Sequence, residues 1–257
     1  MVRRSIFPLS LLLLVLAASL VFGLDPKDPA KRNISFPGPD GTTLSGYIAM
    51  PEGSGPFPAV LMIHEWWGLN YDTALLAEAL SKEGFVVLAA DAFRGSVADT
   101  VQDARSQVQN TPRDQIAADL DASLEYLRTH PKVEAEKVAA LGFCFGGTQS
   151  MYMGTRNPEL SGVIIFYGGG PITSVQQLGE MRSAGPVLGI YGEEDRGIPQ
   201  DQVKDFESAL EAENVEHTIK VYPGVGHAFV KSDTYNAGGT AQKAWMQMVD
   251  FLKRNLK

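Results

Sequence analysis

KVAALGFCFGG, residues 137–147, joins an apolar run to a cysteine set between glycines, and this combination is typical of a strand followed by a sharp turn into a helix. The run 137–143 is typical of a buried strand, and residues 145–155 are predicted to form a helix. Cys144 therefore lies at a sharp strand-to-helix turn, where its backbone is strained and bulky neighbours would collide. Gly142 and Gly146 supply the room that such a turn needs.

Cys144 is the only cysteine in the 257 residues, so it cannot form an internal disulfide. A free cysteine is most often a buried small apolar side chain. At this turn a nucleophile is the favoured interpretation, because the N-terminus of the following helix favours a thiolate.

Apolar strand patterns alternate with amphipathic helix patterns on both sides of the turn. This order predicts a mostly parallel sheet with helices on both faces, opened by an antiparallel hairpin around the turn residues 38–41, as one domain over 33–257. The other expected strands are 33–37, 42–50, 58–64, 85–91, 162–167, 186–191 and 216–222; the other expected helices are 71–84, 99–110, 112–129, 200–212 and 240–255.

Two more polar loops follow strands at the same predicted edge of the sheet. Asp195 lies in GEEDRGIP after 186–191, and His227 lies in GVGHAF after 216–222. A nucleophile, an acid and a histidine in this order are typical of the α/β-hydrolase fold, with cysteine here in place of serine. The histidine moves protons to and from the reacting groups, and the acid orients it. Three other histidines are assigned structural roles: His64, His130 and His217.

The loop HEWWGLN, residues 64–70, is the fourth candidate segment. Tetrahedral intermediates in this fold are bound by two backbone N–H groups, predicted here to be those of Phe145 and Trp66. Trp67 is expected to line the pocket beside them.

Taken together, HEWWGLN, DAFRG, GFCFGG, GEEDRGIP and GVGHAF resemble the dienelactone hydrolase family over about residues 30–255. The resemblance implies a Cys144–His227–Asp195 triad, and Glu65 as a residue that contacts the thiol and helps to generate the thiolate. It also implies that Arg94 binds a substrate carboxylate. Where the dienelactone enzymes carry a second arginine, this chain has Lys231, a point charge that offers no planar fork.

The expected reaction is hydrolysis of an ester or lactone through a thioester, with no metal and no organic cofactor. Phe93 and Phe229 are further expected pocket residues. The net charge of −8 argues against a nucleic-acid partner and an obligatory membrane partner. The protein is expected to be a monomer or a small homo-oligomer.

Residues 1–23 read as a signal peptide, because Arg3 and Arg4 precede the apolar stretch 9–22. Cleavage after Gly23 would release a secreted or periplasmic protein that begins with a polar lead-in, residues 24–32. The alternative is an uncleaved N-terminal anchor. Asn33 fits an N-glycosylation pattern, which matters only in a eukaryotic secretory pathway.

Two functional alternatives stay open. One is an exported carboxylesterase of broad specificity that has the fold without the lactone substrate. The other is a catalytically silent binding or redox module. The complete set of triad residues argues against silence, and there is no second cysteine to resolve an oxidised thiol.

Overall fold

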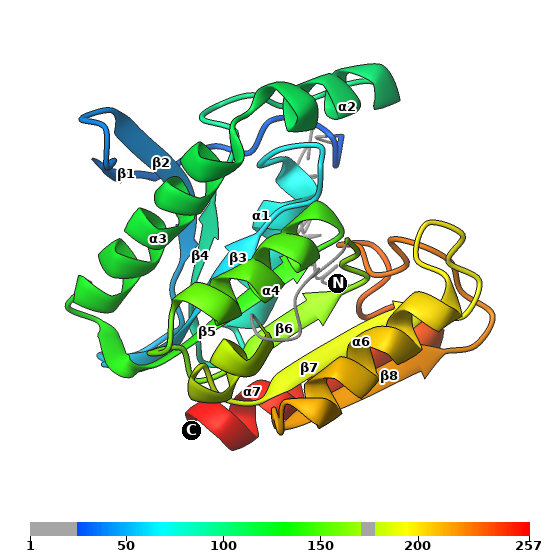
Figure 1. Cartoon of the computed structure of the whole chain (residues 1–257). Coiled ribbons are helices and arrows are strands. Elements are labelled where there is room, and N and C mark those ends of the chain that lie inside the picture. The colour runs from blue at the N-terminus through cyan, green and yellow to red at the C-terminus, as the bar shows by residue number, and fades with distance from the viewer. Residues whose placement is uncertain (1–24, 171–177) are drawn as a thin grey trace, which may run out of the picture.

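An eight-stranded sheet, counted over residues 25–170 and 178–257 that the computed structural model describes, forms the centre of the molecule (Figure 1). The strands lie in the order β1-β2-β4-β3-β5-β6-β7-β8. Their bounds are β1 Ile34–Pro37, β2 Thr43–Ala49, β3 Phe57–Ile63, β4 Val86–Ala90, β5 Val133–Phe143, β6 Val163–Phe166, β7 Val187–Gly192 and β8 His217–Tyr222. The predicted signal peptide, residues 1–23, lies outside the described residues.

The strand directions confirm the predicted topology. β1 pairs antiparallel with β2, and β2 antiparallel with β4, so the hairpin occupies one edge of the sheet. Every pairing from β4 through β3 to β8 is parallel. β3, β4 and β6 are almost wholly buried, which is why their sequences are continuous apolar runs without alternation.

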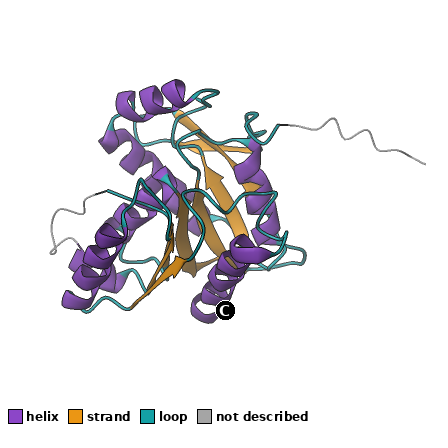
Figure 2. Cartoon of the chain, turned by 90° about the vertical axis from the view of Figure 1, so that its right-hand side faces the viewer, coloured by secondary structure: helices purple, strands orange, loops and turns teal. Residues whose placement is uncertain are grey.

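Helices cover both faces of the sheet, as expected. α3, α4 and α6 lie on the face toward the viewer in Figure 1, and α1 and α7 lie behind it; Figure 2 shows the sheet edge-on between the two layers. The bounds are α1 Tyr71–Ser81, α2 Val101–Asn110, α3 Arg113–Thr129, α4 Phe145–Arg156, α6 Gln200–Ala212 and α7 Gly239–Leu256, with a 3-10 turn η1 at Glu180–Ser183. No helix in the described ranges is long and apolar enough to span a membrane.

β5 is longer than its apolar pattern predicts, since it begins at Val133 instead of residue 137. Val133 pairs with Phe57, and the register then shifts before Ala59 pairs with Val138. Of the extra residues 133–136, only Val133 is buried, so this end lacks the apolar run that marks the buried half of the strand.

Residues 25–32, which we call the N-terminal strap, pack against the start of α1. The carbonyls of Asp28 and Pro26 accept from the N–H groups of Tyr71 and Asp72 at 2.7 and 2.9 Å. The first N–H groups of a helix have no partner within the helix, so the strap satisfies two of them. The N–H of Ala30 also donates to the carbonyl of Leu69 at 3.1 Å, beside the loop of the two tryptophans.

Candidate active site

Cys144 occupies the predicted turn between β5 and α4. Its φ of +55° lies in the left-handed region, which is strained for a residue with a Cβ. A Cβ on Gly142 would lie 1.9 Å from the carbonyl oxygen of Gly146, and one on Gly146 would lie 2.2 Å from that of Ile63. Both positions therefore require glycine for packing reasons.

His227 and Asp195 form a hydrogen-bonded pair at the ends of β8 and β7. His227 Nδ1 lies 2.6 Å from Asp195 Oδ2, and the Asp195 side chain is completely buried. Asp195 Oδ1 accepts from the backbone N–H groups of Gly197 and Ile198 at 2.8 and 3.1 Å. With three contacts on its oxygens, the carboxylate is fixed, and it orients the imidazole so that Nε2 is left for other partners.

Two backbone N–H groups from different loops are directed at the Cys144 thiol. They belong to Phe145 and Trp66, the two residues predicted to bind an oxyanion. The Trp66 loop is held from outside, because the Gln107 amide of α2 donates to the Trp66 carbonyl and the N–H of Ala98 donates to that of Trp67 at 2.9 Å.

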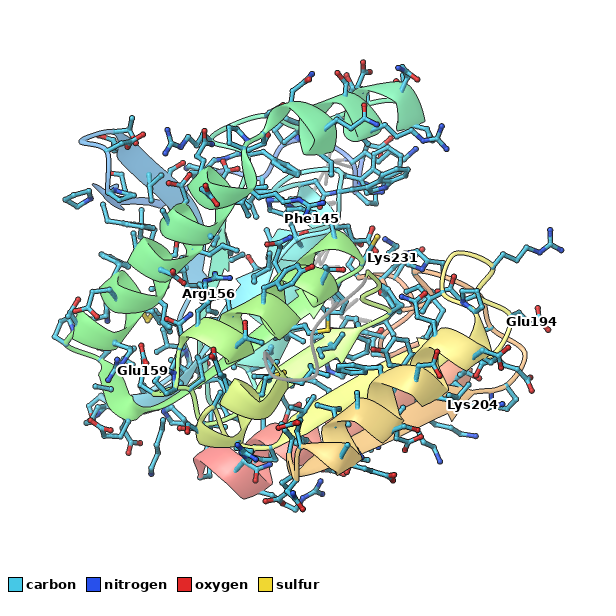
Figure 3. The ribbon with its side chains drawn as sticks, in the orientation of Figure 1. Phe145, Arg156, Glu159, Glu194, Lys204 and Lys231 are labelled. Atoms are coloured by element: carbon cyan, nitrogen blue, oxygen red, sulfur yellow. The ribbon has the colours of Figure 1, made fainter. Side chains whose placement is uncertain are left out.

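Glu65 lies beside the thiol and forms an ion pair with Lys231. Its Oε2 accepts from the Lys231 ammonium, whereas its Oε1 is buried and has no hydrogen-bond partner among the described residues. Figure 3 shows Lys231 and Phe145 at the same edge of the sheet, while Arg156, at the other end of α4, points toward the opposite side.

These groups meet at one pocket of about 790 Å³. Aromatic rings form much of its wall, and Lys231 and Arg196 contribute positive charge. The lining residues are Glu65, Trp66, Trp67, Cys144, Phe145, Thr148, Tyr167, Gly169, Glu194, Asp195, Arg196, Gly197, Ile198, His227, Ala228 and Lys231. The sequence patterns did not single out Thr148, Arg196 or Ile198, although the last two lie inside the GEEDRGIP motif.

The thiol is held in its protonated form, which corrects the expectation of a thiolate at the helix N-terminus. Burial raises the pKa of Cys144 to about 12, and the negative charge of Glu65 adds to the effect. The two backbone N–H groups and Lys231 act in the opposite direction but are outweighed. No hydrogen bond joins the thiol to His227 within the described structure, so the sulfur at rest lies with Glu65 and the N–H groups.

We therefore expect the protein to react slowly with iodoacetamide. At pH 8 Cys144 should be alkylated at least about a hundredfold more slowly than in the urea-unfolded chain, because only the thiolate reacts. The rate should keep rising with pH beyond 9, the ordinary thiol value. Intact-mass analysis over a pH series measures both rates. A plateau reached below pH 9 would contradict the raised pKa.

His64 is confirmed as a structural residue. It is fully buried, its Nε2 accepts from the N–H of Ala92 at 3.1 Å, and its Nδ1 lies 2.6 Å from the carbonyl of Glu65. Burial lowers its pKa, so the ring stays neutral and donates through Nδ1. His64 thereby fixes the peptide between Glu65 and Trp66, which carries the N–H of Trp66.

Two of the expected pocket aromatics lie behind the pocket wall instead of lining it. The Phe93 ring packs on Phe145 with centroids 4.9 Å apart. Phe229 packs against Tyr167 and Tyr222 at 5.6 and 6.0 Å. Trp67 does line the pocket, as expected.

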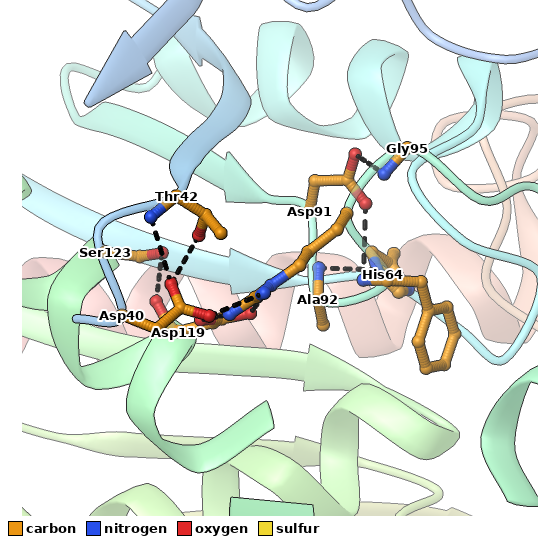
Figure 4. Close-up of polar contacts among 10 residues, drawn as sticks. Asp40, Thr42, His64, Asp91, Ala92, Gly95, Asp119 and Ser123 are labelled. Carbon is orange, nitrogen blue, oxygen red and sulfur yellow. Dashed lines mark hydrogen bonds and ion pairs between the residues drawn. The ribbon is translucent and has the colours of Figure 1, made fainter. Parts of the chain in front are cut away.

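Arg94 is not brought to the pocket, and the role in carboxylate binding implied by the resemblance finds no support in its position. Its Nε and one terminal nitrogen donate to both oxygens of Asp119, at 2.7 and 2.8 Å, and its other terminal nitrogen donates to Asp40 at 2.9 Å. Figure 4 shows the two acceptors, Asp119 and Asp40, with their further partners Ser123 and Thr42. Each of the three guanidinium nitrogens thus donates to a carboxylate of α3 or of the β1–β2 turn. The same loop is shaped by Asp91, which accepts from the N–H of Gly95 at 2.8 Å.

This network predicts that Arg94→Gln affects stability more than substrate binding. The Asp119 side chain is only 2% exposed, so loss of its partner leaves a buried charge uncompensated. We expect a loss of roughly 2–3 kcal/mol in the free energy of unfolding, below the range for a fully buried pair because Arg94 is partly exposed. Urea unfolding measures this change. A Michaelis constant that rises for anionic esters only would restore Arg94 as a substrate residue.

Among residues 25–170 and 178–257 no group of three or more His, Cys, Asp or Glu side chains could hold a metal ion. The polar groups of the pocket contact one another in two pairs, His227–Asp195 and Lys231–Glu65. Their arrangement offers a thiol, two oxyanion donors and a proton-transfer pair.

Comparison with known proteins identifies the family of the chain. The family model for the "Dienelactone hydrolase family" matches residues 44–256. The chain belongs to the dienelactone hydrolase family. As a member of this family it is a carboxylic ester hydrolase with the α/β-hydrolase fold, as the motifs predicted.

Individual relatives match over nearly their whole length. A "Putative carboxymethylenebutenolidase" of Aquifex aeolicus is 33% identical over 85% of this chain and 96% of its own. "Protein usf" of Aquifex pyrophilus is 34% identical over 84% of this chain and 96% of its own. The crystal structure of a "Putative Dienelactone Hydrolase" from Klebsiella pneumoniae superposes with a TM-score of 0.74 at 28% identity, covering 86% of this chain and 98% of that one.

Proposed function

We propose that this family member hydrolyses a carboxylic ester or lactone with Cys144 as nucleophile, His227 as proton carrier and Asp195 as its orienting acid. One observation carries the proposal. The strained Cys144 turn places the thiol against two backbone N–H groups in the same pocket as the hydrogen-bonded His227–Asp195 pair.

The reaction follows from these positions. The sulfur turns from its resting contacts toward the substrate carbonyl, its proton passes to His227 Nε2, and the S–C bond forms. The N–H groups of Phe145 and Trp66 stabilise the resulting oxyanion. As the oxyanion collapses, the C–O bond breaks, and His227 protonates the leaving oxygen to give an alcohol and a thioester. His227 then deprotonates water, which attacks the thioester and releases the acid and the thiol.

Glu65 is assigned to assist removal of the thiol proton. Its unpartnered Oε1 is a buried acceptor, and its charge is balanced on the other oxygen by Lys231. A negative charge beside a resting thiol keeps the proton on sulfur until substrate arrives. The enzyme therefore holds a cysteine that is less exposed to oxidation than a free thiolate.

Broad ester specificity is a second candidate, favoured by the pocket itself. The volume of about 790 Å³ is large for a small lactone, Arg94 is directed elsewhere, and Lys231 is already paired with Glu65. Only Arg196 lines the pocket as a positive charge without an ion pair among the described residues. An exported carboxylesterase fits these features as well as a lactone-specific enzyme does.

A panel of substrates, assayed with purified protein, tests the Cys144 mechanism and the breadth of ester specificity. Lactones and aryl esters should be compared with and without a carboxylate, and the acyl adduct should be sought on Cys144 by peptide mass after rapid acid quench. Turnover with an adduct on Cys144 supports the mechanism, and a flat preference across the panel supports the broad esterase. Failure to turn over any ester would favour the silent module.

We further propose that the protein acts outside the cytoplasm after loss of residues 1–23. The basic start and the apolar stretch 9–22 support export, and the strap at 25–32 begins just after the expected cleavage site. Intact mass of native protein should correspond to a chain that begins near Leu24. Recovery of the full-length chain from the cytosol would contradict export, and a full-length chain in membranes would indicate the anchor.

A further inference from the structure

The loop between β8 and α7 carries both His227 and Lys231, and it is held at several points. The Tyr167 hydroxyl donates to the carbonyl of Val230 at 3.1 Å. On the other side of Lys231, one oxygen of Asp72 accepts from both the N–H and the hydroxyl of Ser232, at 2.9 and 2.5 Å. No motif of the sequence pointed to the second anchor.

We infer that Asp72 is a positioning residue of the active site, which acts through Ser232 to hold the Lys231 ammonium against Glu65. Its contact lies 160 residues away along the chain, so it is no part of the local capping of α1. The inference rests on the proposed role of Cys144. It adds Asp72 as a residue that controls the charges around the thiol.

The backbone on both sides of Lys231 is fixed by this contact. The N–H bound by Asp72 belongs to the peptide that joins Lys231 to Ser232, and the carbonyl of the same peptide accepts from the N–H groups of Tyr235 and Thr234 at 2.9 and 3.1 Å. The N–H of Lys231 donates to the Thr234 hydroxyl at 2.8 Å. The Lys231 side chain thus starts from an ordered backbone, which lowers the entropy cost of its ion pair.

Asp72 is itself rigidly placed. It lies in the first turn of α1, where a carboxylate is favoured by the helix dipole, and its N–H is bound by the strap carbonyl of Pro26. Dipole compensation alone would account for an acidic residue here. It would not account for two hydrogen bonds to the loop of His227 and Lys231, and these bonds carry the inference.

The chemical consequence reaches the thiol through charge. Lys231 lowers the pKa of Cys144 and Glu65 raises it, so the balance depends on where the ammonium lies. Without Asp72 the peptide after Lys231 loses its anchor, and the ammonium is no longer held at Glu65. The thiol then meets a less compensated negative charge and ionises less readily.

The test measures alkylation of Cys144 by iodoacetamide in Asp72→Ala and Asp72→Asn, followed by intact mass. We expect Asp72→Ala to slow the reaction about threefold, which corresponds to a rise of about half a unit in the thiol pKa. Asp72→Asn keeps an acceptor oxygen and should stay near the wild-type rate. In a Lys231→Ala background, Asp72→Ala should change nothing further.

Asp233→Ala is the matched control, because Asp233 is exposed on the same loop and forms no hydrogen bond or ion pair with the described residues. If Asp72→Ala fails to fold, Ser232→Ala removes only the hydroxyl contact and should slow alkylation by a smaller margin. An unchanged rate in folded Asp72→Ala (or in Ser232→Ala, if Asp72→Ala does not fold) overturns the inference, and so does an equal slowing by Asp72→Ala in the Lys231→Ala background. The readout needs no turnover, so it is independent of whether Cys144 proves to be the nucleophile.

Discussion

Cys144→Ala is expected to lower turnover of the best ester by about four to six orders of magnitude, the scale seen when a triad nucleophile is removed. Two features of the site account for the size of this expected loss in turnover. The proposed oxyanion donors remain, but no other side chain in the pocket is a thiol, and the His227–Asp195 pair loses the group that we propose it deprotonates. Stability should change little, because alanine suffers the same positive-φ strain as cysteine.

The measurement is turnover of one aryl ester and one lactone, with circular dichroism as the folding check. Cys144→Ser is the matched variant, because it changes one atom. A hydroxyl needs stronger base assistance than a thiol, so we expect it to be at least about tenfold slower. Wild-type turnover in the alanine variant would end the assignment of Cys144 as nucleophile, whatever the outcome for Asp72.

The second large effect is structural: Gly146→Ala should destabilise the fold by at least about 3 kcal/mol. The added Cβ would meet two backbone carbonyl oxygens, those of Ile63 at 2.2 Å and His64 at 2.6 Å. Backbone atoms of a central strand cannot rotate away, so β3 and α4 must separate. The midpoint of thermal unfolding should fall by roughly 6–12 °C for a domain of this size.

Gly226→Ala is the control for this prediction. It lies in the loop before His227, its φ is not in the left-handed region, and the nearest atom to an added Cβ is the Glu194 carbonyl oxygen at 3.6 Å. Calorimetry on both variants should show a large shift for Gly146 and almost none for Gly226. Equal shifts would mean that the close approach of α4 to β3 does not limit stability.

The sequence was sufficient to predict the sheet and the Cys144 turn, because both leave local signals. Buried parallel strands appear as apolar runs, and a crowded turn needs glycine at fixed offsets. Asp195 and His227 were found by the same means, since each follows a strand at the same edge. The start of β5 at Val133 was missed because a half-exposed strand end has no such run.

Contacts between distant segments had no local signal. Whether Arg94 faces a substrate or Asp119 depends on where α3 lies, which the loop DAFRG does not encode. The Lys231–Glu65 pair joins residues 166 positions apart. The burial of Cys144 in the folded chain raises the pKa of its thiol. This effect outweighs that of the helix N-terminus, which the local sequence pattern suggested.

The strap has a consequence for where the folded unit begins. The family match starts at residue 44, inside β2, whereas the strap and β1 both precede it. A fragment trimmed to 44–256 would leave β2 paired only with β4 and expose the edge that β1 covers, and exposed strand edges promote pairing between molecules. Such a fragment would retain Cys144, Asp195 and His227 and still be prone to aggregate, so the smallest well-behaved enzyme extends to residue 25.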